Sequence, residues 1–169
     1  MKGQRIPAGT VFRSPVHFLA FGFGSGLAPV APGTVGTLAA VPAWLGIAML
    51  PAWWQVGVVV AAMVVGIWLC GRSAGMLGVH DHGGIVWDEF VGLWLTMLLA
   101  PTAGLGGDWP WLLGGFLAFR LFDIAKPWPI KRLDRDVAGG LGIMLDDILA
   151  AVYAAALLRI VQYVLTIFQ

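Results

Sequence analysis

The chain has 169 residues, of which 59% are hydrophobic and only 11% are charged, and its formal net charge is +1. A soluble globular domain carries about 25% charged residues, so the composition argues against a soluble fold. The near-neutral charge also argues against a nucleic-acid-binding protein. The length fits one membrane-embedded domain over residues 1–169, and the N-terminal stretch lacks the pattern of a cleaved signal peptide.

Before the first long apolar segment, residues 18–33 are apolar but repeatedly interrupted by glycine and proline. The interruptions are Gly22, Gly24, Gly26, Pro29, Pro32 and Gly33. These residues disfavour a continuous helix. Because non-helical backbone at membrane depth is stable only when it is buried in protein or lines a wet cavity, we expect a broken or re-entrant segment under the functional site.

Five apolar segments follow in chain order, and we interpret each as a membrane-crossing helix. They are Thr34–Leu50, Ala52–Cys70, Val86–Ala100, Trp111–Ile124 and Leu141–Phe168. A spanning helix needs about 20 mostly apolar residues, which the second and fifth segments provide best. Thr34 is the expected N-cap of the first helix. The predicted fold is therefore an all-α, multi-pass membrane helical bundle.

The basic residues predict the orientation of this bundle. If the segments alternate from an N-terminus inside, all but one of the 10 Lys and Arg residues lie on the cytoplasmic side. These are Lys2, Arg5, Arg13, Arg72, Arg120, Lys126, Lys131, Arg132 and Arg135, whereas Arg159 lies far along the last helix. The predicted outer loops, around Pro51 and from Pro101 to Pro110, contain no Lys or Arg.

The acidic residues gather on the same predicted side. Only Asp108 falls outside; the others are Asp81, Asp88, Glu89, Asp123, Asp134, Asp136, Asp146 and Asp147. A carboxylate inside an apolar run costs several kcal/mol unless it faces a wet cavity, a cation or a metal ion. Acids crowded at one membrane face therefore indicate a site at the cytoplasmic interface.

Three stretches carry these acids: His80–Glu89, Arg120–Asp134 and Gly139–Asp147. Carboxylates without a cysteine or a third nearby histidine favour Mg²⁺ over zinc. The expected metal ligands are Asp88, Glu89, Asp146 and Asp147, and further catalytic candidates are Asp81 and Asp123. Adjacent helical residues point about 100° apart, so we expect only one member of each pair to face an ion squarely.

Basic residues beside such a metal site suit a phosphate group, through bidentate arginine contacts and charge neutralisation. Arg120 and Lys126 are the expected phosphate ligands, with Arg72 a weaker candidate. The combination of acid, metal and base at one membrane face predicts phosphoryl chemistry on a lipid headgroup, with phospholipid and membrane as the partners. No oligomeric state is predicted.

Other interpretations of the same residues remain open at this stage. Asp88 and Glu89 could only complement a helix dipole, and Arg120 with Asp123 could be a structural ion pair. The chief alternative function is a cation or proton transporter that uses buried carboxylates. A transporter would need acids near the bilayer centre and on both sides of it.

Four long motifs, in order, resemble the phosphatidylglycerophosphatase A family. They are residues 22–29 with 32–34, residues 80–92, residues 120–135 and residues 139–147. The resemblance implies hydrolysis of phosphatidylglycerophosphate to phosphatidylglycerol and phosphate, within phospholipid biosynthesis. It also implies dependence on Mg²⁺, an all-helical fold and a place in the bacterial inner membrane.

Overall fold

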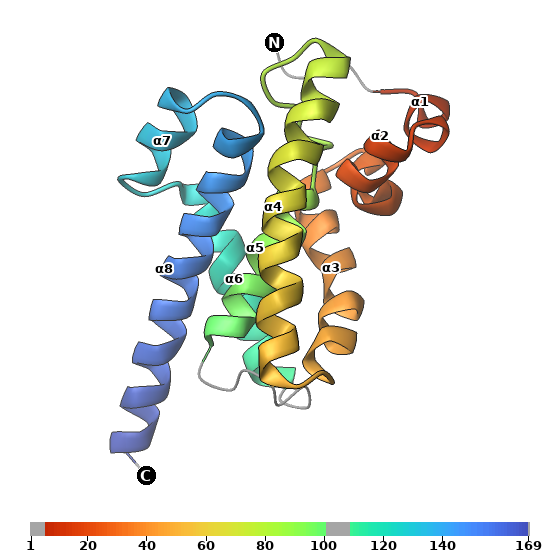
Figure 1. Cartoon of the computed structure of the whole chain (residues 1–169). Helices are drawn as coiled ribbons and strands as arrows, with labels where there is room; N and C mark the ends of the chain where they lie inside the picture. Colours follow the sequence, from red (N-terminus) through yellow and green to blue (C-terminus); the bar gives the residue numbers. More distant parts are fainter. Residues whose placement is uncertain (1–5, 101–108, 169) are drawn as a thin grey trace.

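The computed structural model describes residues 6–100 and 109–168, and every regular element in these ranges is helical (Figure 1). The elements are α1 (Ala8–Arg13), α2 (Pro15–Ala20), the 3₁₀ helix η1 (Gly22–Leu27), α3 (Pro32–Ala48), α4 (Ala52–Leu77), α5 (Trp87–Leu99), α6 (Trp109–Ala125), α7 (Ile130–Asp136) and α8 (Gly139–Ile167). Lys2, Arg5, Asp108 and most of the predicted loop Pro101–Pro110 lie outside the described residues. The all-α prediction is confirmed for the part of the chain that is described.

Most helix boundaries differ from the prediction by one or two residues, and two of the differences have a clear local cause. The first long helix begins at Pro32, with Ala31 as its N-cap, so the prediction of Thr34 as N-cap was wrong. Proline is suited to the first helical position because its φ is preset and the amide hydrogen it lacks would be unpaired there. At the other difference, α4 continues past Cys70 and ends where Gly78 adopts φ 67°. Glycine accepts this left-handed conformation without strain, which makes it a common helix terminator.

Among the helices of the described residues, only α4 and α8, with 26 and 29 residues, are long and apolar enough to cross a membrane by themselves. Within the protein, 33% of the most apolar window of α4 and 28% of that of α8 are buried. The core therefore does not account for most of their apolar surface. The other three predicted spans are shorter: α3 and α6 have 17 residues each and α5 has 13, or about 20 Å of helix.

Helix α5 lies at the centre of the bundle and packs against α3, α4 and α8. Its residues Phe90, Val91 and Leu93 are almost completely buried. Helix α8 begins directly against α4. The two backbones are so close that a side chain at Gly140 would collide with the carbonyl oxygen of Ile67. These contacts place the early turns of α8 beside the first turn of α5.

The chain before α3 is broken, as predicted. Helix α2 gives way to η1, inside which Phe23 and Gly24 have φ values of 58° and 97°. The break packs on the loop that precedes α5: a side chain at Gly26 would collide with the carbonyl oxygen of Gly84. In Figure 1 the short helices α1, α2 and α7 lie at the end of the bundle opposite the C-terminus. The broken segment therefore packs beside the start of α5.

Candidate active site

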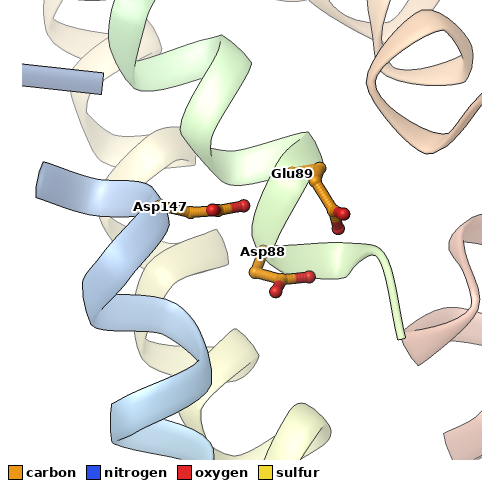
Figure 2. A group of neighbouring side chains, drawn as sticks. All are labelled: Asp88, Glu89 and Asp147. Carbon is orange, nitrogen blue, oxygen red and sulfur yellow. The ribbon is translucent and has the colours of Figure 1, made fainter. Parts of the chain in front are cut away.

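Asp88, Glu89 and Asp147 form one group of carboxylates. One oxygen from each lies within 4.8 Å of the others, and Asp147 reaches from α8 toward the first turn of α5 (Figure 2). The expectation that only one member of each adjacent pair faces an ion squarely stays a prediction, although one oxygen of Asp88 and one of Glu89 lie close together. Both residues lie at the start of α5, and the longer side chain of Glu89 brings its oxygen back toward that of Asp88.

A second group consists of Asp123, Asp146 and Asp147, whose oxygen atoms also lie within 4.8 Å of one another. Asp123 comes from the last turns of α6, whereas Asp146 and Asp147 come from α8. Asp147 belongs to both groups and its residue surface is only 2% exposed. The two groups are therefore one continuous carboxylate cluster centred on Asp147.

Four oxygen atoms of this cluster are buried without a hydrogen-bond partner in the described structure: Asp88 Oδ1, Glu89 Oε2, Asp146 Oδ1 and Asp147 Oδ2. A buried, unpaired carboxylate oxygen is costly unless it is protonated or faces a positive charge, so several together favour the binding of a cation. Oxygen-only donor sets are the ones that Mg²⁺ prefers. The residues present thus fit a magnesium site, and Asp123 joins the four predicted ligands as a fifth candidate.

Arg120 supplies positive charge at one side of the cluster. Its Nη1 lies 2.5 Å from Asp123 Oδ2 and 3.8 Å from Glu89 Oε1, and it donates to Thr37 Oγ1 at 3.4 Å. The Nε–H of Arg120 is buried and has no partner among the described residues. Arg120 therefore bridges α6 and α5, and it retains a donor for a further anion.

The first turn of α3 also touches this part of the site. A side chain at Gly33 would collide with Glu89 Oε1 and would lie 3.2 Å from both terminal nitrogens of Arg120. Thr37, which is fully buried, donates to the Gly33 carbonyl at 2.8 Å. Of the glycine-rich segment predicted to lie under the site, Gly33 is the residue that directly contacts both Glu89 and Arg120.

Lys126 supplies the positive charge at the opposite side. Its Nζ lies 2.5 Å from Asp146 Oδ2 and 2.9 Å from Asp134 Oδ1. Burial disfavours the charged ammonium, but the hydrogen bonds and charges of Asp146 and Asp134 outweigh it and raise the pKa of Lys126. Lys126 is therefore a permanent cation that links the loop after α6 to α7 and α8.

Two predicted residues lie apart from this cluster. Arg72 is exposed on α4 and makes no hydrogen bond or ion pair with the carboxylate groups in the described ranges. Asp81 is exposed in the loop between α4 and α5 and belongs to neither carboxylate group. Conversely, sequence reasoning missed Thr37, because a single threonine inside an apolar helix carries no signal of a distant arginine partner.

Comparisons with known proteins identify the family of this chain. The model of the family described as phosphatidylglycerophosphatase A matches residues 18–162. Phosphatidylglycerophosphatase A of Escherichia coli is 50% identical over 150 residues, which cover 89% of this chain and 85% of that protein. The Haemophilus influenzae protein of the same name is 43% identical over 151 residues, covering 89% and 90%.

A third relative carries a different name. A Bacteroides thetaiotaomicron protein, provisionally named a phosphatidylinositol-3-phosphatase, is 36% identical over 150 residues, covering 85% of this chain and 91% of that protein. No solved structure matches the chain. With a family model that spans every segment contributing to the carboxylate cluster, the chain belongs to the phosphatidylglycerophosphatase A family.

Proposed function

We propose that this protein is a lipid phosphatase that hydrolyses phosphatidylglycerophosphate to phosphatidylglycerol and inorganic phosphate. Family membership supports the substrate. The observation that carries the chemistry is the buried carboxylate cluster around Asp147, with unpaired oxygen atoms and with Arg120 beside it. A cluster of this kind suits a divalent cation and the phosphomonoester that the cation would help to bind.

We also propose that the protein is a multi-pass helical bundle in the bacterial inner membrane. The apolar surfaces of α4 and α8 that the core leaves uncovered need lipid contact. Exposed tryptophans support the placement: Trp53 and Trp54 begin α4, and Trp109 begins α6, whereas Trp128 follows the other end of α6. Tryptophan is enriched at both membrane–water interfaces, so the two sets mark the two edges of the bilayer.

The active site faces the cytoplasm in this proposal. The described basic residues other than Arg159 belong to α1, to α7, to the C-terminal parts of α4 and α6 and to the loop after α6. Figure 1 shows α1 and α7 at the end of the bundle opposite the C-terminus, and α8, which carries Asp146 and Asp147 in its early turns, begins toward that end. Basic residues accumulate on the cytoplasmic side of membrane proteins. Arg159 is at the opposite end, where its Nε donates to the carbonyl of Leu99, the last residue of α5, at 3.0 Å.

Mg²⁺ held by Asp88, Glu89, Asp123, Asp146 and Asp147 would neutralise the phosphate and lower the pKa of a water molecule. The free Nε–H of Arg120 and its terminal nitrogens would hold the phosphate oxygens, in the bidentate geometry for which guanidinium is suited. A carboxylate of the cluster would accept the proton of the attacking water, and the departing glycerol oxygen would take up a proton. A covalent aspartyl-phosphate is the competing route, and acid quench during turnover separates it from direct attack, because only the covalent route leaves phosphate attached to the protein.

Transport of a cation or proton by the same carboxylates is disfavoured by their arrangement. The described acids all lie toward one end of the bundle, and Arg159 is the only charged side chain described near the other end. A transport path needs polar groups near the bilayer centre and toward both sides. The arrangement instead suits chemistry at one interface.

The first experiment is phosphate release from phosphatidylglycerophosphate by the purified protein in neutral detergent, with Mg²⁺ or with excess chelator. Phosphatidic acid and phosphatidylinositol 3-phosphate serve as competing substrates, the latter because of the name of the Bacteroides relative. Asp147→Asn is the variant expected to be inactive, and Arg13→Gln, which removes an exposed charge from α1, is the control. Release that depends on Mg²⁺ and is lost in Asp147→Asn supports the proposal. No release from folded protein on any of the three lipids would refute it.

A further inference from the structure

Four basic side chains and a tryptophan surround a pocket beside the carboxylate cluster. Lys126, Trp128, Lys131, Arg132 and Arg135 line this cavity of about 290 Å³ between the end of α6 and α7. Trp128 is 78% exposed, so the pocket opens at the surface rather than into the core. The mechanism proposed above uses none of these five residues.

The positive charge of this pocket is only partly neutralised by the protein. Arg132 and Arg135 both pair with Asp136, at 3.5 Å and 2.9 Å, and Lys126 pairs with Asp134 and Asp146. Lys131 makes no ion pair or hydrogen bond within the described ranges. Asp136 is thus shared by two arginines, and Lys131 has no acidic partner among the described residues. The side chains around the cavity therefore carry an excess of positive charge.

Lys126 joins this pocket to the catalytic cluster. The same ammonium that lines the cavity lies 2.5 Å from Asp146 Oδ2, and Asp146 is grouped with Asp123 and Asp147. An anion in the pocket would therefore lie on one side of Lys126 and the phosphate undergoing hydrolysis on the other. Phosphatidylglycerophosphate carries two phosphates, a terminal monoester and an inner diester, separated by one three-carbon glycerol unit.

We propose that the pocket lined by Lys126, Lys131, Arg132 and Arg135 binds the inner phosphodiester of the lipid substrate, and thereby selects a two-phosphate headgroup. This inference rests on the proposed function. Lys131 is the principal contact because its ammonium is not engaged by an acid of the protein. Arg120 then holds the terminal phosphate at the carboxylate cluster, and Lys126 stands between the two phosphates.

The surroundings of the pocket favour a lipid over a free phosphate ester. The Tyr153 hydroxyl donates to the carbonyl of Trp128 at 3.2 Å, which joins the pocket wall to α8. Four and eight residues further along the same face of α8 are Leu157 and Val161, which line an apolar groove against Leu117 and Leu121 of α6. The groove has a volume of about 490 Å³ and begins one residue from Arg120. An acyl chain attached to a phosphate in the pocket would have an apolar path beside it.

The kinetic test compares Lys131→Gln with Arg13→Gln, which removes one exposed positive charge from α1 at the same end of the molecule but outside the pocket. Lys131→Gln is expected to raise KM for phosphatidylglycerophosphate about tenfold, and to change kcat much less, because it removes a charge-assisted contact made in the bound state. Arg13→Gln is expected to change KM less than twofold. Equal increases of KM in the two variants would show that the positive charges only attract the anionic substrate in a general way, which would overturn the proposal. No effect of Lys131→Gln would overturn it too.

A binding measurement separates this proposal from the proposed function. Calorimetric titration of Asp147→Asn in neutral detergent uses short-chain phosphatidylglycerol, short-chain diacylglycerol and glycerol 3-phosphate. Phosphatidylglycerol should bind more tightly than the other two, and adding Lys131→Gln should weaken it about tenfold. If phosphatidylglycerol binds in this way but the wild-type protein releases no phosphate, the proposed activity is contradicted and the proposed pocket is not. Equal binding of diacylglycerol, which lacks the phosphodiester, or tighter binding of glycerol 3-phosphate, would overturn the phosphodiester pocket.

Discussion

Lys126 Nζ lies 2.5 Å from Asp146 Oδ2, so the loop after α6 is fastened to the second turn of α8. This contact both neutralises a buried carboxylate and positions a residue of the basic pocket. Asp146 is 7% exposed and could not keep its charge at low cost without the ammonium, and the same ammonium lines the basic pocket. The catalytic cluster and the headgroup pocket consequently share one lysine.

Replacing Lys126 with methionine should destabilise the protein, because the substitution leaves the Asp146 carboxylate buried without its cation. We expect a loss of about 2 kcal/mol, below the full cost of breaking a buried pair because the lysine side chain is partly exposed. Thermal unfolding in detergent measures the change. Lys131→Gln, which removes an unpaired lysine from α7, is the control. An equal melting temperature for the two variants would contradict the role given to Lys126.

Gly33→Ala should reduce activity without a comparable loss of stability. The added methyl group would collide with Glu89 Oε1 and crowd both terminal nitrogens of Arg120, so one of the two must move. Misplacement of a catalytic group by about 1 Å can cost 100-fold in rate, and we expect kcat/KM to fall at least tenfold. Gly46→Ala on the same helix is the matched control, since a methyl group there meets nothing within 4 Å. Equal kcat/KM values for the two variants would show that Gly33 does not set the position of Glu89.

Removal of Mg²⁺ should lower the melting temperature of the protein, because the ion would bind the folded carboxylate cluster and not the unfolded chain. A ligand at 100 times its dissociation constant adds about 2.7 kcal/mol. Asp147→Asn should largely abolish this Mg²⁺-dependent stabilisation, because Asp147 belongs to both carboxylate groups, whereas Asp88→Asn and Asp123→Asn each affect one. The melting temperature with Mg²⁺ and with chelator, together with Mn²⁺ binding followed by electron paramagnetic resonance, tests this without any turnover. A full Mg²⁺ response in Asp147→Asn would place the metal elsewhere.

His17 should make stability depend on pH. It is 3% exposed on α2, and its Nδ1 forms a 2.8 Å hydrogen bond with Ser73 Oγ of α4. Burial lowers the pKa of His17 below its ordinary value of 6.5. Below pH 6.5 the unfolded chain therefore binds a proton that the folded chain resists, so unfolding takes up a proton. The contribution of neutral His17 is complete above pH 6.5 and falls as the pH drops toward the folded pKa, by at most about 1.4 kcal/mol per pH unit.

Comparison of the wild type with His17→Gln isolates this contribution, because glutamine can bond to Ser73 but does not titrate. The melting temperature of the wild type should fall more steeply than that of the variant between pH 7 and pH 5. Parallel curves would show that the acid sensitivity of the protein arises from other groups.

The sequence by itself determined the helices and the candidate residues. Long apolar runs punctuated by proline and glycine predicted Ala52–Cys70 and Leu141–Phe168 to within about two turns, and the observed helices are Ala52–Leu77 and Gly139–Ile167. The glycine and proline content of residues 18–33 predicted the break that η1 contains. The positions of the helices and of the break depend on local sequence. Inside an apolar segment the backbone must satisfy its own hydrogen bonds, and a helix is the main conformation that does so.

Only the tertiary structure decided which of the candidates meet. Asp123 lies 23 residues from Asp146 in the sequence, and Gly33 and Glu89 are further apart still, so no local periodicity relates them. The rotation and crossing of α3, α5, α6 and α8 bring Asp123 to Asp147 and Gly33 to Glu89, while Arg72 and Asp81 are left exposed. Those rotations follow from packing contacts such as that between Gly140 and the Ile67 carbonyl, which exist only once the helices have assembled.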